Sequence, residues 1–341
     1  MKTALLAVLL FGIMIYPHEL GHFLAAKLVG VKVNEFAFGM GPTIWKKQRG
    51  ETLHSIRLFP VGGFCAMEGE DENSEDPRAF GRKKPWQKLV VTAAGSFMNM
   101  LCAVLIMSLV IGVMGFTTTT IGEVLEDMPA QKAGIMTEDK ILKVDGTPIE
   151  QWVDVSTALQ KKGGEAVEVE IERGSEIQTI TLTPEMSETV DAAGNKVKGY
   201  MVGFTCKVSH NPFKALVSGV QSTWNINKMM FVSLKQLFTG EVGIDSMSGP
   251  VGMIEMVNES TQYGFWYYGF LAALVCVNLA IINMLPFPAL DGGRIIFILY
   301  SMITGRKVNT KVEGFIHIVG MALLFGLMIY VTMNDVMRIF G

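Results

Sequence analysis

Positions 3–29 read TALLAVLLFGIMIYPHELGHFLAAKLV, an almost unbroken apolar run that contains the polar string HELGH at positions 18–22. A helix rises 1.5 Å per residue, so a run of this length crosses about 30 Å of hydrocarbon. Ionisable side chains are costly inside a bilayer and face protein or water there. The stretch therefore predicts a membrane-spanning helix that carries a functional polar site. A cleaved signal peptide is the alternative, but no small-x-small cleavage site separates the apolar run from HELGH.

Composition places the whole chain among membrane proteins. Half of its 341 residues are apolar and only 18% are charged. Three further runs are long enough to span a bilayer: residues 89–116, 264–285 and 315–332. Residues 214–238 are also apolar, but Lys214, Lys228 and Lys235 interrupt them, which predicts an amphipathic helix at the membrane surface.

Charge and cysteine content exclude two other classes of protein. The net charge is −3 and no continuous basic face accompanies the lysines, so no nucleic-acid partner is expected. The four cysteines are far apart in the sequence, without the paired spacing of a disulfide-stapled or thiolate-zinc domain.

Basic residues in short loops predict the orientation in the membrane. Arg78, Arg82 and Lys88 belong to a basic cluster between the first two spans, and Arg306 and Lys311 precede the last one. Such loops face the cytoplasm, so both should lie on that side. Four spans with both termini outside satisfy the two loops together.

Residues 121–184 form a charged, turn-rich region of different character. Val167, Val169 and Ile171 alternate with glutamates as in a half-buried strand. The string PAQKAGIMTEDKILKVDGTPI at 129–149 resembles part of a bacterial PDZ domain. The resemblance implies an inserted α+β PDZ-like domain, which could take an extended peptide as ligand. The predicted orientation of the spans puts this domain outside the cell.

The segment KVNEFAFGMGPTIWKKQRGETLHSIRLFPVGGFCAMEGE at 32–70 mixes alternating apolar residues with glycines. This pattern predicts β-hairpins on the cytoplasmic side. Non-helical backbone near a membrane must be buried in protein or line a wet cavity, so the hairpins are expected to lie beside the polar site or at the membrane interface.

HELGH is the strongest local signal for chemistry. Histidines at i and i+4 of a helix lie on one face and can bind one metal ion together, here His18 and His22. Glu19 then stands where a carboxylate can take a proton from a water activated by a zinc ion (Zn²⁺). Pro17 directly precedes the motif and frees carbonyls around Ile13, which a neighbour or water must satisfy.

A catalytic zinc ion needs a third protein ligand. NMLPFPALDGG at 283–293 ends the third span with two prolines and two glycines, which break the helix and aim Asp291 inward near the cytoplasmic side. The first and third spans run in the same direction, so HELGH and Asp291 can share a depth. A turn or capping aspartate is the alternative interpretation of Asp291.

Taken together, these motifs resemble the site-2 protease family of intramembrane metalloproteases, close to its bacterial regulator-of-sigma-E (RseP-like) branch. The residues concerned are HELGH, AAGSFMN at 93–99, the PDZ-like segment, SGPVG at 248–252 and NMLPFPALDGG. The resemblance implies zinc ligation by His18, His22 and Asp291, Glu19 as base, and Asn283, with Asn278 as a weaker candidate, as substrate-positioning residues. Asn99 is expected to bond between helices near the site.

The expected fold is a polytopic α-helical membrane protein with four transmembrane helices, an inserted PDZ-like domain and a membrane-associated β-hairpin region on the cytoplasmic side. The expected segments are residues 1–30, the first transmembrane helix; 31–88, the cytoplasmic β-rich loop; 89–116, the second transmembrane helix; 117–206, the PDZ-like domain; 207–263, amphipathic interfacial helices; 264–293, the third transmembrane segment; and 294–341, a cytoplasmic loop and the fourth helix.

The implied function is zinc-dependent hydrolysis of transmembrane segments in a bacterial cell membrane, with the active site near the cytoplasmic side. Expected partners are membrane lipid and single-span substrates such as anti-sigma factors. Clearance of remnant signal peptides is an alternative for the same site. A non-catalytic PDZ scaffold is a second alternative, against which Glu19 argues, and metal transport is a third, against which the lack of further intramembrane carboxylates argues.

Overall fold

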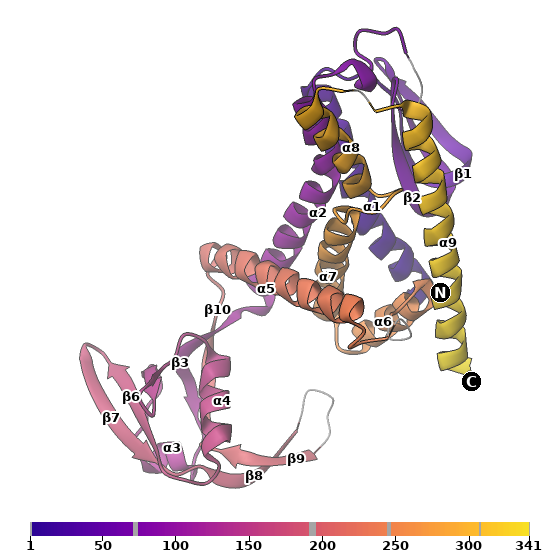
Figure 1. The fold of residues 1–341 in the computed structure, drawn as a ribbon. Coiled ribbons are helices and arrows are strands. Elements are labelled where there is room, and N and C mark those ends of the chain that lie inside the picture. The colour runs from indigo at the N-terminus through magenta and orange to yellow at the C-terminus, as the bar shows by residue number, and fades with distance from the viewer. Residues whose placement is uncertain (1, 71–73, 191–195, 244–246, 307, 341) are drawn as a thin grey trace. The chain divides into compact units, whose positions relative to one another are not determined.

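The computed structural model describes residues 2–70, 74–190, 196–243, 247–306 and 308–340 (Figure 1). The chain divides into two compact units. We call Met1–Val110 together with Leu216–Gly341 the membrane unit, and Ile111–Ala215 the PDZ-like unit.

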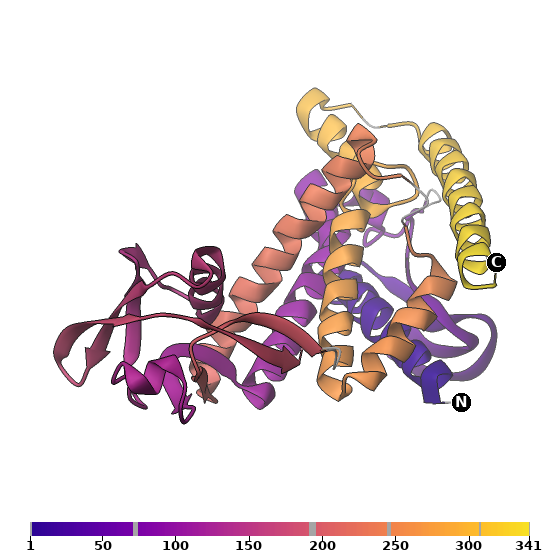
Figure 2. The same ribbon diagram turned by 90° about the horizontal axis from the view of Figure 1, so that it is seen from below.

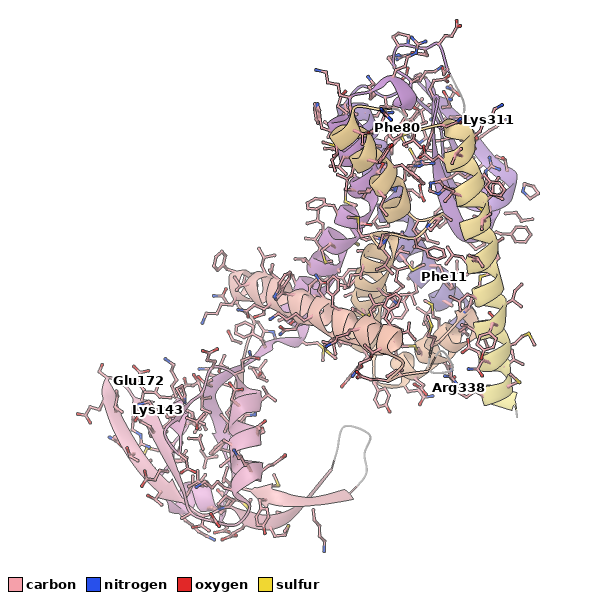
Figure 3. The ribbon with its side chains drawn as sticks, in the orientation of Figure 1. Phe11, Phe80, Lys143, Glu172, Lys311 and Arg338 are labelled. Carbon is pink, nitrogen blue, oxygen red and sulfur yellow. The ribbon has the colours of Figure 1, made fainter. Side chains whose placement is uncertain are left out.

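Four helices in the described part of the chain are long and apolar enough to cross a membrane: α1 (Lys2–Leu28), α2 (Pro85–Met114), α7 (Phe265–Asn283) and α9 (Thr310–Phe340). They cover the four spans predicted from the sequence, so the chain is a multi-pass membrane protein. Half of the most apolar stretch of α7 is buried inside the protein, but only 11% of that of α9. Helix α7 is therefore the most enclosed of the four spanning helices, and α9 is the least enclosed. Lys311 and Arg338 mark the ends of the apolar stretch of α9 (Figure 3).

Pro17 lies inside α1 and has no N–H to donate to the carbonyl of Ile13. The thiol of Cys276 on α7 donates to this carbonyl instead, with an Sγ–O distance of 3.8 Å. The predicted compensation of a freed carbonyl is confirmed. Through Cys276, helix α7 contacts α1 just before HELGH.

The β-rich region is an antiparallel pair of long strands, β1 (Val33–Arg49) and β2 (Thr52–Met67). Phe36 is aligned with Cys65 and also with His54, so the first part of β1 has a segment of β2 on each side. The hairpin is thus folded over on itself. Residues 63–67 form one outer segment of this sheet, and residues 45–49 form the other.

Glycines explain why one folded hairpin forms where the sequence predicts several. Gly39 and Gly62 have φ values of 88° and 86°, a region that side chains with a Cβ avoid. A Cβ on Gly39 would also come within 2.6 Å of the carbonyl oxygen of Phe59. These glycines bend the strands without ending them.

Shorter or amphipathic helices complete the membrane unit: α5 (Pro212–Thr239), α6 (Pro250–Gln262), α8 (Asp291–Thr304) and the 3-10 helix η1 (Phe80–Arg82). Helix α5 contacts α2, because Gly219 lies against Ser108. Figure 2 shows the membrane unit from below. The buried carboxylate of Asp335 on α9 accepts hydrogen bonds from the N–H groups of Gly249 and Gly252 at 2.9 and 2.8 Å. Asp335 therefore holds the start of α6.

In its described part, the PDZ-like unit contains a sheet and the helices α3 (Pro129–Lys132) and α4 (Trp152–Lys162). Its strand order is β10-β3-β4-β6-β7, with β5 on β4 and a separate β8-β9 pair. The strands are β3 (Phe116–Val124), β4 (Lys140–Val144), β5 (Thr147–Pro148), β6 (Val167–Arg173), β7 (Glu176–Leu182), β8 (Glu185–Val190), β9 (Lys196–Met201) and β10 (Phe204–Ser209).

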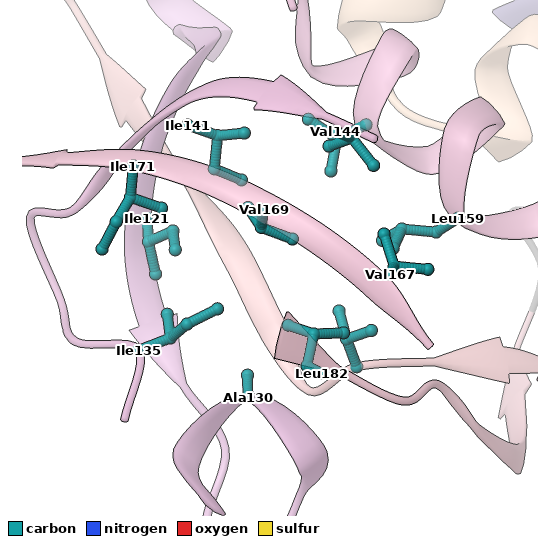
Figure 4. Close-up of a cluster of buried hydrophobic side chains, with 12 residues drawn as sticks. Ile121, Ala130, Ile135, Ile141, Val144, Leu159, Val167, Val169, Ile171 and Leu182 are labelled. Carbon is teal, nitrogen blue, oxygen red and sulfur yellow. The ribbon is translucent and has the colours of Figure 1, made fainter. Parts of the chain in front are cut away.

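Aliphatic side chains from these strands and from α4 form a single core (Figure 4). Val167, Val169 and Ile171 on β6 are completely buried and alternate with more exposed residues, as the sequence pattern predicts. The expected α+β domain inserted into a helical membrane protein is confirmed.

Candidate metal centre

Helix α1 places His18 and His22 on one face, because they are one turn apart. Their Nε2 atoms are 3.2 Å from each other, and both rings are largely buried. The Nδ1–H of His22 donates to the carbonyl oxygen of Val91 on α2 at 2.9 Å. A carbonyl can only accept, so this bond keeps the proton on Nδ1 and leaves the Nε2 lone pair for a metal.

Glycines let α2 come close enough to touch the two imidazoles. A Cβ on Gly95 would overlap with Nε2 of His22 and would be 2.7 Å from Cε1 of His18. A Cβ on Gly21 of α1 would likewise overlap with the backbone of Ala94. The α1–α2 contact at the histidines therefore depends on glycine in both helices.

Asp291 comes to the histidines from the start of α8, after a tight loop that follows α7. A Cβ on Gly293 would overlap with the carbonyl of Phe287, and one on Gly292 with the carbonyl of Leu285, so the two glycines allow the loop to fold back on α8. The Oδ2 atom of Asp291 is 3.3 Å from Nε2 of His18 and 3.4 Å from Nε2 of His22.

The three atoms fit a zinc ion. Zinc binds imidazole nitrogen and carboxylate oxygen at about 2.0–2.2 Å with tetrahedral geometry, which places neighbouring ligand atoms about 3.3–3.6 Å apart. The observed sides of 3.2, 3.3 and 3.4 Å form such a triangle. Oδ2 of Asp291 is buried and makes no hydrogen bond. Among the described residues, His18, His22 and Asp291 form the one cluster of three or more potential metal ligands.

A cavity of about 500 Å³ opens over this triangle. Glu19 and Asn283 line it, together with residues 62–67 of β2. The side-chain amide nitrogen of Asn283 is 3.2 Å from Nε2 of His18. Asn278 is not among the lining residues, so of the two predicted asparagines only Asn283 is brought to the centre.

Two charged residues of the cavity were not singled out from the sequence. Arg294, one turn after Asp291 on α8, forms an ion pair with Glu70, which follows β2. The spacing of three residues from Asp291 could have indicated that Arg294 shares its helix face. The position of Glu70 depends on how the hairpin folds, and no local pattern reveals it.

Asn99 is fully buried in α2, and neither atom of its amide has a hydrogen-bond partner within the described residues. The expected interhelical bond is therefore absent from this structure. Ser96, one turn before it, also has an unpaired hydroxyl. Both lie on the face of α2 that carries Gly95.

Comparison with known proteins finds one matching family and similar proteins of nearly the same extent. The profile of peptidase family M50 matches residues 6–327. A Clostridium acetobutylicum protein named as a zinc metalloprotease is 37% identical over 333 residues, which cover 97% of this chain and 96% of that one. The regulator of sigma-W protease RasP from Bacillus subtilis is 28% identical over 422 aligned positions, covering 99% of both chains.

Among solved structures, the PDZ domain of an SdrC-like protein from Listeria monocytogenes matches with a TM-score of 0.21 and 17% identity. The match covers 27% of this chain and 88% of that one.

Proposed function

The chain belongs to peptidase family M50, and we propose that in this zinc metalloendopeptidase His18, His22 and Asp291 hold the zinc ion while Glu19 acts as general base. The observation that carries the proposal is the triangle of three ligand atoms with sides of 3.2–3.4 Å, at the floor of a cavity that Glu19 also lines. Zinc at this centre would supply the Lewis acidity that makes water a nucleophile near neutral pH.

The residues around the metal ligands have separate tasks in this proposal. Glu19 follows His18 directly and takes the proton from the attacking water, then gives it to the leaving amine. Asn283 holds the substrate backbone through its amide, beside the ligand that it already contacts. Residues 63–67 of β2 line the cavity as an outer segment of the sheet, and an unwound substrate segment pairs with the outer edge of this segment.

We propose single-span membrane proteins as the substrates, with anti-sigma factors among them. The support is the name of the Bacillus subtilis relative, a regulator of a sigma factor, together with the four spanning helices of this chain. Remnant signal peptides have the same chemistry and remain the alternative substrate class. The basic loops favour a cytoplasmic position for the metal centre and an outside position for the PDZ-like unit.

Two substitutions test the assignment of ligand and base. Glu19→Gln should keep close to one zinc per chain and lower hydrolysis by about 10²- to 10⁴-fold, because it removes the base and leaves the three ligands. Asp291→Ala should lower both zinc content and hydrolysis, because it removes a ligand. Metal analysis and peptide cleavage on the same purified samples would decide. Normal zinc content and cleavage in Asp291→Ala would require another third ligand.

A further inference from the structure

Helix α9 contacts the loop that delivers Asp291. The backbone N–H of Ala289, two residues before Asp291, donates a hydrogen bond to Nδ1 of His317 on α9 at 2.9 Å. A backbone N–H can only donate, so Nδ1 of His317 is the acceptor. His317 lies outside both HELGH and NMLPFPALDGG.

Ala289 needs support from outside the loop. Its φ value is 75°, in the left-handed region that residues with a Cβ rarely adopt. Such a conformation persists where surrounding contacts enforce it, and these conformations cluster at functional sites. The bond to His317 is one such contact, and it fixes the residue at which the chain turns toward Asp291.

A second contact of α9 lies on the same helix face. Gly320 is three residues after His317 and is buried against Pro288, the residue before Ala289. A Cβ on Gly320 would come within 2.5–2.7 Å of the side chain and carbonyl of Pro288. The ring of Phe297 on α8 also packs at a tilt against the His317 ring, with centroids 5.8 Å apart.

We infer that His317 is a positioning residue for the zinc centre: it holds the turn at Ala289 so that the carboxylate of Asp291 reaches the two histidines. The contact is unexpected because α9 is the least buried of the four spanning helices. The inference rests on the proposed ligand role of Asp291. This role of His317 makes the fourth span, α9, a part of the metal site although α9 supplies no metal ligand.

The test compares full-length variants purified in detergent. His317→Leu removes the acceptor and keeps an apolar side chain. His317→Asn keeps an acceptor, because Oδ1 of asparagine is attached at the same Cγ position as Nδ1 of histidine. Gly320→Ala pushes on Pro288, and Gly326→Ala is its control on the same helix, since no atom lies within 4 Å of a Cβ there. Zinc affinity is measured by competition with a chelator, and kcat and KM are measured separately.

His317→Leu and Gly320→Ala should weaken zinc binding about 10- to 100-fold, the usual effect of removing support from a metal ligand. His317→Asn should bind zinc nearly as the unmodified protein does, and Gly326→Ala should be unchanged. Equal affinity in His317→Leu and the unmodified protein would overturn the inference alone. An asparagine variant as weak as the leucine variant would overturn the role of the hydrogen bond. Absence of zinc from the unmodified protein would instead overturn the proposed function as well.

Discussion

The two units both bury apolar side chains, but they differ in how many polar side chains they bury. In the PDZ-like unit the core is aliphatic, and Asp139 is the one polar residue of its described part that is fully buried. The membrane unit buries many more polar side chains: His18, His22, Thr52, Ser55, Thr92, Ser96, Asn99, Thr223, Ser260 and Asp335. Its outer surface is rich in leucine, valine, methionine and phenylalanine.

The difference follows from the solvent around each unit. Water accepts polar groups, so a domain in water turns them outward and buries apolar ones. Lipid does not, so polar side chains of a spanning unit gather inside, where each must find a partner or serve a site. Asp139 is matched by Arg173 at 2.7 Å and by the N–H of Met136 at 2.8 Å. The Oδ2 atom of Asp291, the proposed zinc ligand, by contrast has no hydrogen bond.

Among the variants that test this comparison of the two units, the largest effect is expected from close packing around the buried histidines. Gly95→Ala places a methyl group where the imidazoles lie, so it should lower zinc affinity and hydrolysis by at least about 10-fold. The control is Gly112→Ala on the same helix, where a Cβ would meet its nearest neighbour at an ordinary 3.6 Å. Chelator competition and cleavage assays measure both. Equal loss in the two variants would show that α2 tolerates no added methyl and that the histidines are not the cause.

The next effect concerns the backbone that lines the cavity. Proline at Phe64, Cys65 or Ala66 removes an N–H from the outer segment of β2, so at least one of these variants should lose up to about tenfold in turnover while it keeps its zinc. Proline at Lys46 or Lys47, in the opposite outer segment, should have little effect on turnover. If the proline variants at Phe64, Cys65 and Ala66 all cleaved as fast as the variants at Lys46 and Lys47, strand pairing between this segment and the substrate would be excluded.

Removal of the PDZ-like unit should change selectivity rather than chemistry, because none of the proposed ligands belongs to it. A variant with residues 116–209 replaced by a short linker should still cleave substrates that have already been shortened outside the membrane. It should also cleave full-length ones that the complete protein rejects. Loss of cleavage for both kinds, with zinc retained, would contradict a filtering role.

The smallest effect on activity is expected at Asp139. Burial raises the pKa of this carboxyl, but the hydrogen bonds from Arg173 and from the N–H of Met136, together with the charge of Arg173, outweigh burial and hold the pKa below its usual value. A depressed pKa stabilises the folded unit above the unfolded pKa of about 4, and this stability is lost as the pH falls below it. Asp139→Asn should therefore destabilise the PDZ-like unit by about 1–3 kcal/mol at pH 7. The stability of the variant should also fall less than that of the unmodified protein when the pH is lowered below about 4.

Hydrogen exchange of amides in this unit measures the change, and cleavage of shortened substrates should stay normal. Equal exchange in Asp139→Asn and the unmodified protein at pH 7 would show that the ion pair adds no stability.

The sequence predicts the parts of this molecule whose chemistry is local. A run of apolar residues predicts each span, alternation predicts β6, and HELGH with Asp291 predicts three ligands, because few residue types bind zinc and few occur in the spans. Pro17 even predicts a freed carbonyl, and Cys276 satisfies it.

Residues that act through packing could not be found in this way. The closeness of Gly95 to the histidines depends on the distance between two helices, and the pairing of Glu70 with Arg294 depends on the folded hairpin. His317 meets Ala289 only because α9 lies against the loop before α8. Each of these contacts joins segments far apart in the sequence, so no pattern within one segment contains it.

The proposed metal centre joins the first helix of the chain to the start of α8, and this separation has a consequence for biosynthesis. Ribosomes add about 5–20 residues per second, so HELGH is made roughly ten seconds to a minute before Asp291. During that time the two histidines lack their carboxylate partner, and the binding triangle cannot close. With this assignment of the ligands, hydrolysis cannot begin until the third span and the loop after it have been made.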